Sequence, residues 1–143
     1  MTVFYANELA PRNAVPVGQV DGAVVNSHVR GHRATITLAA QTTADTIVVA
    51  LPNLGDSFLF GILTTDTSLG TSTIAIGNAT AAGKYRAAAV FTATNTPTLF
   101  GAYTAAAGTY TKLAVAETIF ITIATANLPA SGTLVIDIYF AAT

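Results

Sequence analysis

Hydrophobic and polar residues alternate along most of this chain, and the alternation is clearest near its end. In Thr118–Ile123 every second residue is isoleucine, and in Thr133–Phe140 large apolar residues again occupy every second position. A period of two with many β-branched residues is typical of half-buried β-strands. Shorter alternating segments predict six further strands, at Arg33–Leu38, Thr46–Leu51, Phe58–Leu63, Thr73–Ile76, Thr98–Phe100 and Thr109–Leu113.

Turn-forming residues separate these predicted strands. Proline, glycine, asparagine and aspartate gather in Pro52–Gly55, Asp66–Gly70, Asn95–Pro97 and Asn127–Gly132. Ala79–Val90 is alanine-rich, and there a helical turn or two competes with a strand. Eight short strands at roughly ten-residue spacing, without a strand–helix–strand rhythm, predict an all-β fold: a single β-sandwich or jelly-roll-like domain.

The first residues differ from the rest. Residues 1–22 contain Pro11, Pro16, Gly18 and Gly22 and follow neither the helical nor the strand period. We therefore divide the chain into an extended N-terminal arm, residues 1–22, and a β-sandwich domain, residues 23–143. Two interpretations of the arm stay open: it lies across a neighbouring molecule, or it folds back on its own domain or frays.

The alternation also predicts the core, in which each fully buried aliphatic side chain contributes about 1.5–3 kcal/mol. The predicted inward residues are Ile36, Leu38, Ile47, Val49, Leu51, Ile74, Ile76, Ile119, Ile121, Ile123, Leu134, Ile136 and Ile138. Phe120, Val135 and Tyr139 fall on the opposite faces. Aromatic side chains on an outer face of small residues resemble the anchors of protein interfaces.

Composition suggests that those outer faces are covered. Of 143 residues, 52% are hydrophobic but only 9% are charged, against about 25% in an average soluble domain. Alanine and threonine lose little side-chain entropy on contact, which suits permanent packing. We therefore expect an obligate oligomer or capsid-like component. The net charge of −1 gives no reason to expect direct nucleic-acid binding.

Targeting and membrane signals are missing from the sequence. Met1–Pro16 lacks a basic start followed by an apolar run, so we expect no signal peptide. The longest apolar stretches have strand length, well short of the roughly 20 residues of a membrane span. We expect no membrane partner.

Candidate chemistry is sparse. His28 and His32 flank Arg30 on one face of a strand, which leaves three interpretations open: a metal site short of a third ligand, a basic face that docks on acidic neighbours, or an ordinary solvated face. Asp66–Gly70 could begin a calcium loop, but it lacks the carboxylates such loops use, so a hydrogen-bonded aspartate turn is favoured.

Nothing in the sequence supports catalysis. No serine lies in a Gly-x-Ser-x-Gly elbow, no Gly-x-Gly-x-x-Gly run or P-loop exists, and there are no cysteines. We therefore predict a protein that is not an enzyme and that needs no catalytic residue, metal or cofactor. The candidate interface residues are Phe4, Tyr5, His28, Arg30, His32, Lys84, Tyr85, Arg86, Phe120 and Tyr139.

Four runs resemble small virion structural proteins of tailed bacteriophages. They are Arg33–Ala40, Asp45–Ala50, Thr65–Gly77 and Gly83–Gly101, and the resemblance extends over roughly residues 30–140. It implies a head decoration (cement) protein, made in the host cytoplasm and located in the virion. Such proteins bind as trimers or other oligomers over capsomer junctions and stabilise the shell. The resemblance implies as partners the protein itself, with a trimer favoured, and the major capsid protein or other virion proteins.

Two alternatives to the decoration protein remain. One is a head–tail connector, collar, tail or spike-base structural protein. The other is a receptor- or carbohydrate-binding β-sandwich module, for which Tyr85, Tyr103 and Tyr110 are the loop candidates.

Overall fold

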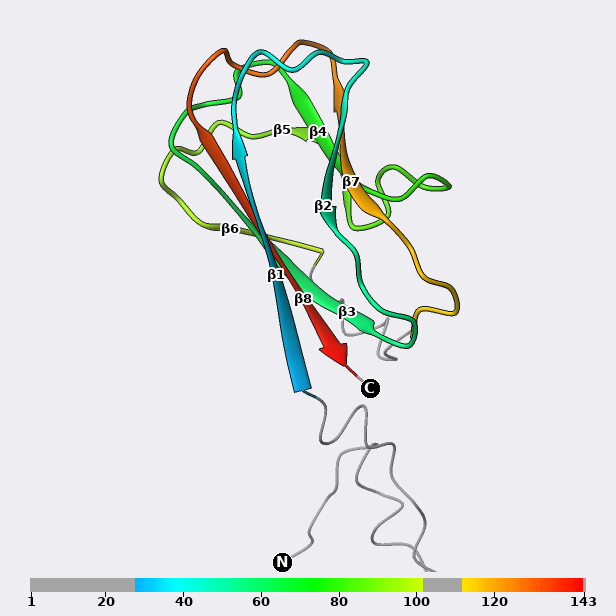
Figure 1. The fold of residues 1–143 in the computed structure, drawn as a ribbon. Coiled ribbons are helices and arrows are strands. Elements are labelled where there is room, and N and C mark those ends of the chain that lie inside the picture. The colour runs from blue at the N-terminus through cyan, green and yellow to red at the C-terminus, as the bar shows by residue number, and fades with distance from the viewer. Residues whose placement is uncertain (1–27, 102–111, 143) are drawn as a thin grey trace, which may run out of the picture.

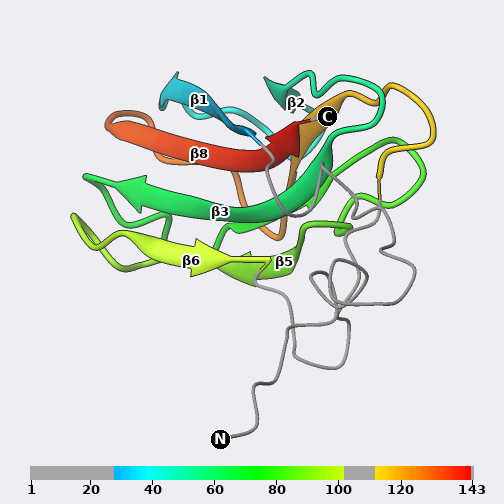
Figure 2. The same ribbon diagram turned by 90° about the horizontal axis from the view of Figure 1, so that it is seen from below.

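A computed structural model describes residues 28–101 and 112–142 of the chain as two antiparallel sheets of four strands each (Figure 1). The strands are β1 (His28–Thr37), β2 (Thr46–Ala50), β3 (Ser57–Thr65), β4 (Thr73–Gly77), β5 (Arg86–Val90), β6 (Thr98–Phe100), β7 (Ile119–Ala124) and β8 (Thr133–Ala142). One sheet has the order β1-β8-β3-β6, whose strands lie side by side in Figure 2, and the other has the order β2-β7-β4-β5. The predicted all-β class is confirmed, and the described residues contain no helix.

The pairing scheme is that of a jelly roll. β1 pairs with β8, β2 with β7, β3 with β6 and β4 with β5, so the first half of the chain runs back along the second half as one long hairpin. Two further pairs, β3 with β8 and β4 with β7, join that hairpin into two sheets. An eight-stranded double sheet of this kind is one way in which all-β domains limit exposed strand edges.

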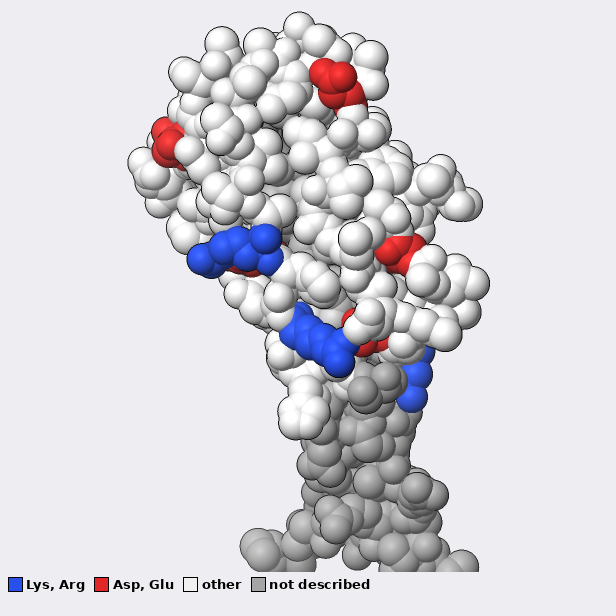
Figure 3. Space-filling model, viewed as in Figure 1, with Lys and Arg blue, Asp and Glu red and all other residues white. Residues whose placement is uncertain are grey.

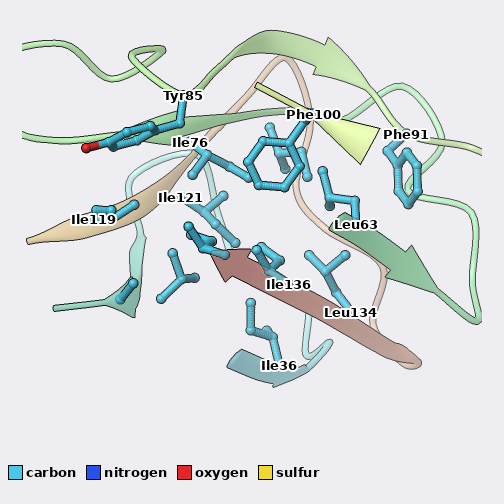
Figure 4. Packing of buried hydrophobic residues seen from close by; sticks show 14 of the residues in the cluster. Ile36, Leu63, Ile76, Tyr85, Phe91, Phe100, Ile119, Ile121, Leu134 and Ile136 are labelled. Atoms are coloured by element: carbon cyan, nitrogen blue, oxygen red, sulfur yellow. The ribbon is translucent and has the colours of Figure 1, made fainter. Parts of the chain in front are cut away.

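The core lies between the two sheets and comes mainly from their central strands. The large apolar residues at alternate positions of β7 and β8 are at most 1% exposed, as the alternation predicted. The side chains of Ile36, Leu63 and Ile76 from flanking strands complete the packing, and the ring of Phe100 closes it beneath β6 (Figure 4). Burial of one face of each sheet thus provides the main stabilising term.

The prediction that Leu51 lies in the core is wrong. Val48 pairs with Phe120 and Ala50 pairs with Ile119, so β2 contains a β-bulge between these positions. Because the extra residue shifts the alternation by one, Val49 and Ala50 are both buried and Leu51 is 63% exposed.

The helical alternative for Ala79–Val90 is also wrong, because residues 86–90 form β5. Its residues Ala87 to Val90 are all exposed, so no apolar period marks this strand. β1 starts at His28, five residues before its predicted start. The predicted strand Thr109–Leu113 lies mostly outside the described residues; of its described part, Lys112 forms an isolated bridge with Ser57. The N-terminal arm lies outside them too.

The sandwich has two distinct ends, because its strands alternate in direction. His28 pairs with Ala142, so β1 begins and β8 finishes at one end, here called the terminal end, together with loops 51–56 and 78–85. The opposite end, called the distal end, carries the four loops 38–45, 66–72, 91–97 and 125–132.

Replacement of Gly61 tests the packing beneath β6. Gly61 in β3 lies opposite Phe100, and a Cβ there would collide with the Phe100 ring. We expect Gly61→Ala to lower the free energy of unfolding by about 1–3 kcal/mol, measured by urea denaturation. A second change, Phe100→Leu, should recover part of that loss in the double variant, since both changes act at one contact. Full stability of Gly61→Ala alone would contradict this packing.

Candidate functional site

The histidines and Arg30 of β1 lie on the inner face of the sandwich. They share that face with Ile36, and the ring of His32 packs edge-on against Phe140 with centroids 5.6 Å apart. His28 and Arg30 extend past the core at the terminal end and are exposed. His28, Arg30 and His32 therefore lie at the edge of the sandwich, where the buried core ends and the exposed surface begins.

Arg30 faces a buried carboxylate. Asp56, which precedes β3, is 1% exposed, and its Oδ2 atom lies 4.0 Å from Nη1 of Arg30. The same oxygen accepts a hydrogen bond of 3.0 Å from the backbone N–H of Asn53, which closes the turn between β2 and β3. A buried carboxylate requires such donors, since an unpaired one is costly. The sequence did not single out Asp56, because a lone aspartate in a turn carries no distinctive signal.

A groove of about 310 Å³ lies between the edge strands β1 and β2. Its lining residues are His32, Arg33, Val48, Val49, Ala50 and Leu51. Val48 and Leu51 are more than half exposed, so the β2 side of the groove is apolar and the β1 side is basic. A groove beside unpaired strand edges can accept apolar side chains or an extended segment of a partner.

The outer face of the β1-β8-β3 sheet combines an ion pair with an aromatic stack. Arg33 donates two hydrogen bonds, of 2.7 and 2.8 Å, to the carboxylate of Asp137 in β8. These bonds and the carboxylate charge raise the pKa of Arg33. Next to them, Tyr139 stacks on Phe60 with centroids 4.8 Å apart. The predicted outward position of Tyr139 is confirmed, and its ring is half-buried by Phe60.

The side chains of Lys84, Tyr85 and Arg86 do not form one basic patch, because each has different surroundings. Tyr85 is 7% exposed and packs on Phe58, with its hydroxyl donating to Glu117. Lys84 reaches the same carboxylate at 2.8 Å and remains partly exposed. The guanidinium of Arg86 turns back onto backbone carbonyls, among them those of Ala89 and Val90, and burial lowers its pKa.

Glu117 is a second buried carboxylate that sequence reasoning missed. It also accepts a hydrogen bond of 2.7 Å from Nδ2 of Asn78, so three side chains of the β4–β5 loop converge on it. Its side chain is 8% exposed. This carboxylate therefore ties the β4–β5 loop to the segment that precedes β7.

The remaining sequence candidates are placed as follows. Phe120 lies half-buried on the outer side of β7. Phe4, Tyr5, Tyr103 and Tyr110 lie outside the described residues. Within the described ranges, no three histidine, cysteine, aspartate or glutamate side chains gather into a possible metal site. A search of the same ranges for a helix long and apolar enough to cross a membrane found none.

Asp66 forms the hydrogen-bonded turn that was favoured over a calcium loop. Its Oδ1 atom accepts bonds from the backbone N–H of Thr133 at 2.7 Å and from the hydroxyl of Thr67 at 2.9 Å. These donors, the Thr133 N–H above all, lower the pKa of Asp66. The carboxylate thus joins the β3–β4 loop to the start of β8.

An eight-stranded jelly roll with an apolar edge groove and few surface charges is thus the class of protein that the geometry defines. No family model and no curated protein matches the chain. Solved structures do match its fold. A chain of the cyanophage Pam1 capsid asymmetric unit aligns with a TM-score of 0.65 and 17% identity, over 82% of this chain and 86% of that one.

Two further solved chains share the fold. One belongs to the acid-stable capsid of Helicobacter pylori bacteriophage KHP30, with a TM-score of 0.59 and 10% identity over 81% of this chain and 89% of that one. The other belongs to the capsid of Ralstonia phage GP4, with a TM-score of 0.59 and 15% identity over 81% and 85%. At these identities the likeness establishes the fold and nothing beyond it.

Removal of the Glu117 carboxylate should loosen the terminal end. We expect Glu117→Ala to lower the free energy of unfolding by about 1–3 kcal/mol, because three side-chain donors lose their acceptor. Glu117→Gln, which keeps one acceptor oxygen, should lose less, and urea denaturation of both variants measures the difference. Equal stability of Glu117→Ala and the unmodified protein would show that the carboxylate does not hold this loop.

The Asp66 turn predicts a defined pH dependence. Because the folded-state pKa lies below the usual 3.8, the ionised carboxylate stabilises the fold above that value, and the stabilisation is lost as pH falls through the depressed pKa. The unmodified protein should therefore exceed Asp66→Ala in urea midpoint at neutral pH, and the two should converge in strong acid. A constant difference across the whole pH series would contradict the assignment.

Proposed function

We propose that this chain is a structural protein of a bacteriophage virion, and more specifically a head decoration protein that binds the capsid surface as a homo-oligomer, with a trimer favoured. The observation that carries the proposal is the fold. Three separate phage capsid structures contain a chain that aligns over more than four-fifths of its own length and of this one.

The surface of the domain supports a packing role rather than a catalytic one. β5 presents Ala87, Ala88 and Ala89 to solvent, and its Arg86 side chain is folded onto the backbone. A strand edge of small, uncharged residues associates readily with other chains. In a symmetric particle each such contact is repeated, so contacts of modest strength produce large combined affinity.

The proposal places the protein in the virion, with other copies of itself and the major capsid protein as partners. It assigns no reaction, because most charged side chains of the described residues form ion pairs or hydrogen bonds that hold turns and strands. The stabilising mechanism is the burial of β-sheet surface across boundaries between capsid subunits.

Particle binding tests the proposal directly. Purified protein should sediment as an oligomer and should bind phage heads assembled without it, in many copies distributed over the shell by cryo-electron microscopy. A few copies at a single vertex would instead indicate a connector, collar, tail or spike-base protein. A monomer that binds no part of the particle would overturn the virion assignment.

A further inference from the structure

In the three ion pairs between described residues, the two members of each pair differ in solvent exposure. In each pair the cation is several times more exposed than the carboxylate: side-chain exposure is 48% against 2% for Arg30 and Asp56, 70% against 15% for Arg33 and Asp137, and 38% against 8% for Lys84 and Glu117. Formal charges balance, but the surface presents the positive member. A partner therefore meets cations there, although each pair is neutral overall.

The distal end has the opposite character. Its four loops contain no lysine or arginine, and their charged residues are the exposed Asp45 and Asp66. Figure 3 shows red side chains without blue ones in the upper loops of one face, whereas in its lower half blue side chains lie beside red ones. Exposed charge is therefore distributed unevenly between the two ends: the exposed cations lie toward the terminal end, and the distal loops carry exposed carboxylates.

The terminal end also carries exposed aliphatic side chains on a firm support. Leu51, Leu54 and Val115 are 63%, 61% and 70% exposed. Gly55 donates its backbone N–H to the carbonyl of Leu113 at 3.0 Å, and Leu113 donates to the carbonyl of Asp56 at 2.9 Å. These bonds hold the turn that carries Leu54 beside the segment that carries Val115. Exposed apolar groups on such a support are unfavourable in water and favourable in an interface.

We propose that the terminal end is the docking surface, and that its occupant is a different virion protein whose contact area is apolar at the centre and acidic at the rim. Leu51, Leu54 and Val115 would form the centre, and Arg30 and Lys84 the rim. This inference rests on the proposed virion function and adds which surface binds and what chemistry it meets. The distal loops then face outward.

A second copy of the chain is a poorer occupant of this surface. Its distal loops offer carboxylates, but none of the exposed large aliphatic side chains of the described residues lies in them. Its β5 and β6 edges offer Val90 and Leu99 without any carboxylate in those strands, and its β1–β2 edge offers Val29 and Val48 beside the basic residues His32 and Arg33. None of these surfaces supplies the apolar centre and the acidic rim together, so charge and apolar complementarity favour a different protein.

Photocrosslinking identifies the occupant. A photoreactive residue is introduced at Leu54 in one variant and at Leu99, which is 56% exposed on β6, in a matched control. Both full-length variants are bound to phage heads assembled without the chain and then irradiated. We expect position 54 to crosslink to a different virion protein and position 99 not to. Crosslinks from position 54 to other copies of this chain, or crosslinks from position 99 alone, would overturn the assignment.

Affinity measurements test the energetics on the same heads. Leu54→Ser and Val115→Ser should each weaken binding by about tenfold, since each change removes a large apolar side chain from the centre of the proposed contact. The control Leu99→Ser should leave it unchanged. Binding of the unmodified chain should weaken as NaCl rises from about 50 to about 500 mM, because salt screens the cationic rim.

The two proposals fail in different ways. If the unmodified chain binds no heads, the virion function fails and this docking surface fails with it. If the unmodified chain binds but the Leu54 and Val115 variants bind equally well, the virion function stands and the terminal-end assignment is overturned. Circular dichroism and urea midpoints of the three serine variants separate loss of binding from loss of folding.

Discussion

The fold depends on the contact between its two central strands. β8 lies in the middle of one sheet and β7 in the middle of the other, and their inward side chains are at most 1% exposed. Every other strand pairs, directly or through one neighbour, with one of these two. Because the last two strands of the chain occupy the centres, the sandwich closes only when the end of the chain is in place, which is a long-range arrangement.

That arrangement also decides where charge is found. A small core leaves little room for ionised groups, yet Asp56 and Glu117 are almost fully buried at the terminal end. Each is matched by a cation that remains accessible and by a hydrogen bond, from Asn53 of the same turn for Asp56 and from Asn78 of the β4–β5 loop for Glu117. Burying the acid and exposing the base satisfies the carboxylate internally and leaves a positive surface. A chain with few charges can thus expose mainly cations at one end of the domain.

Two independent observations support the proposed role in a virion: the fold likeness to chains of three phage capsids, and the uneven distribution of exposed cations and aliphatic side chains. The fold likeness is a property of the backbone and says nothing about which surface binds. The distribution of exposed aliphatic side chains and cations is a property of the side chains and requires no comparison. Together they support the proposed docking at the end where β1 begins and β8 finishes, and small uncharged residues are exposed along β5.

The sequence by itself determined the class of fold and most of its core, because strict alternation in residues 119–124 and 133–140 leaves one face to bury. It also determined that Phe120 and Tyr139 face outward. Only the tertiary structure decided that Leu51 is exposed, since a bulge shifts the period, and that alanine-rich residues 86–90 form a strand, since pairing with β4 overrides weak local preference. Tertiary structure likewise brought Glu117 to Lys84 and Asp56 to Arg30, because contacts between residues distant in sequence leave no local pattern.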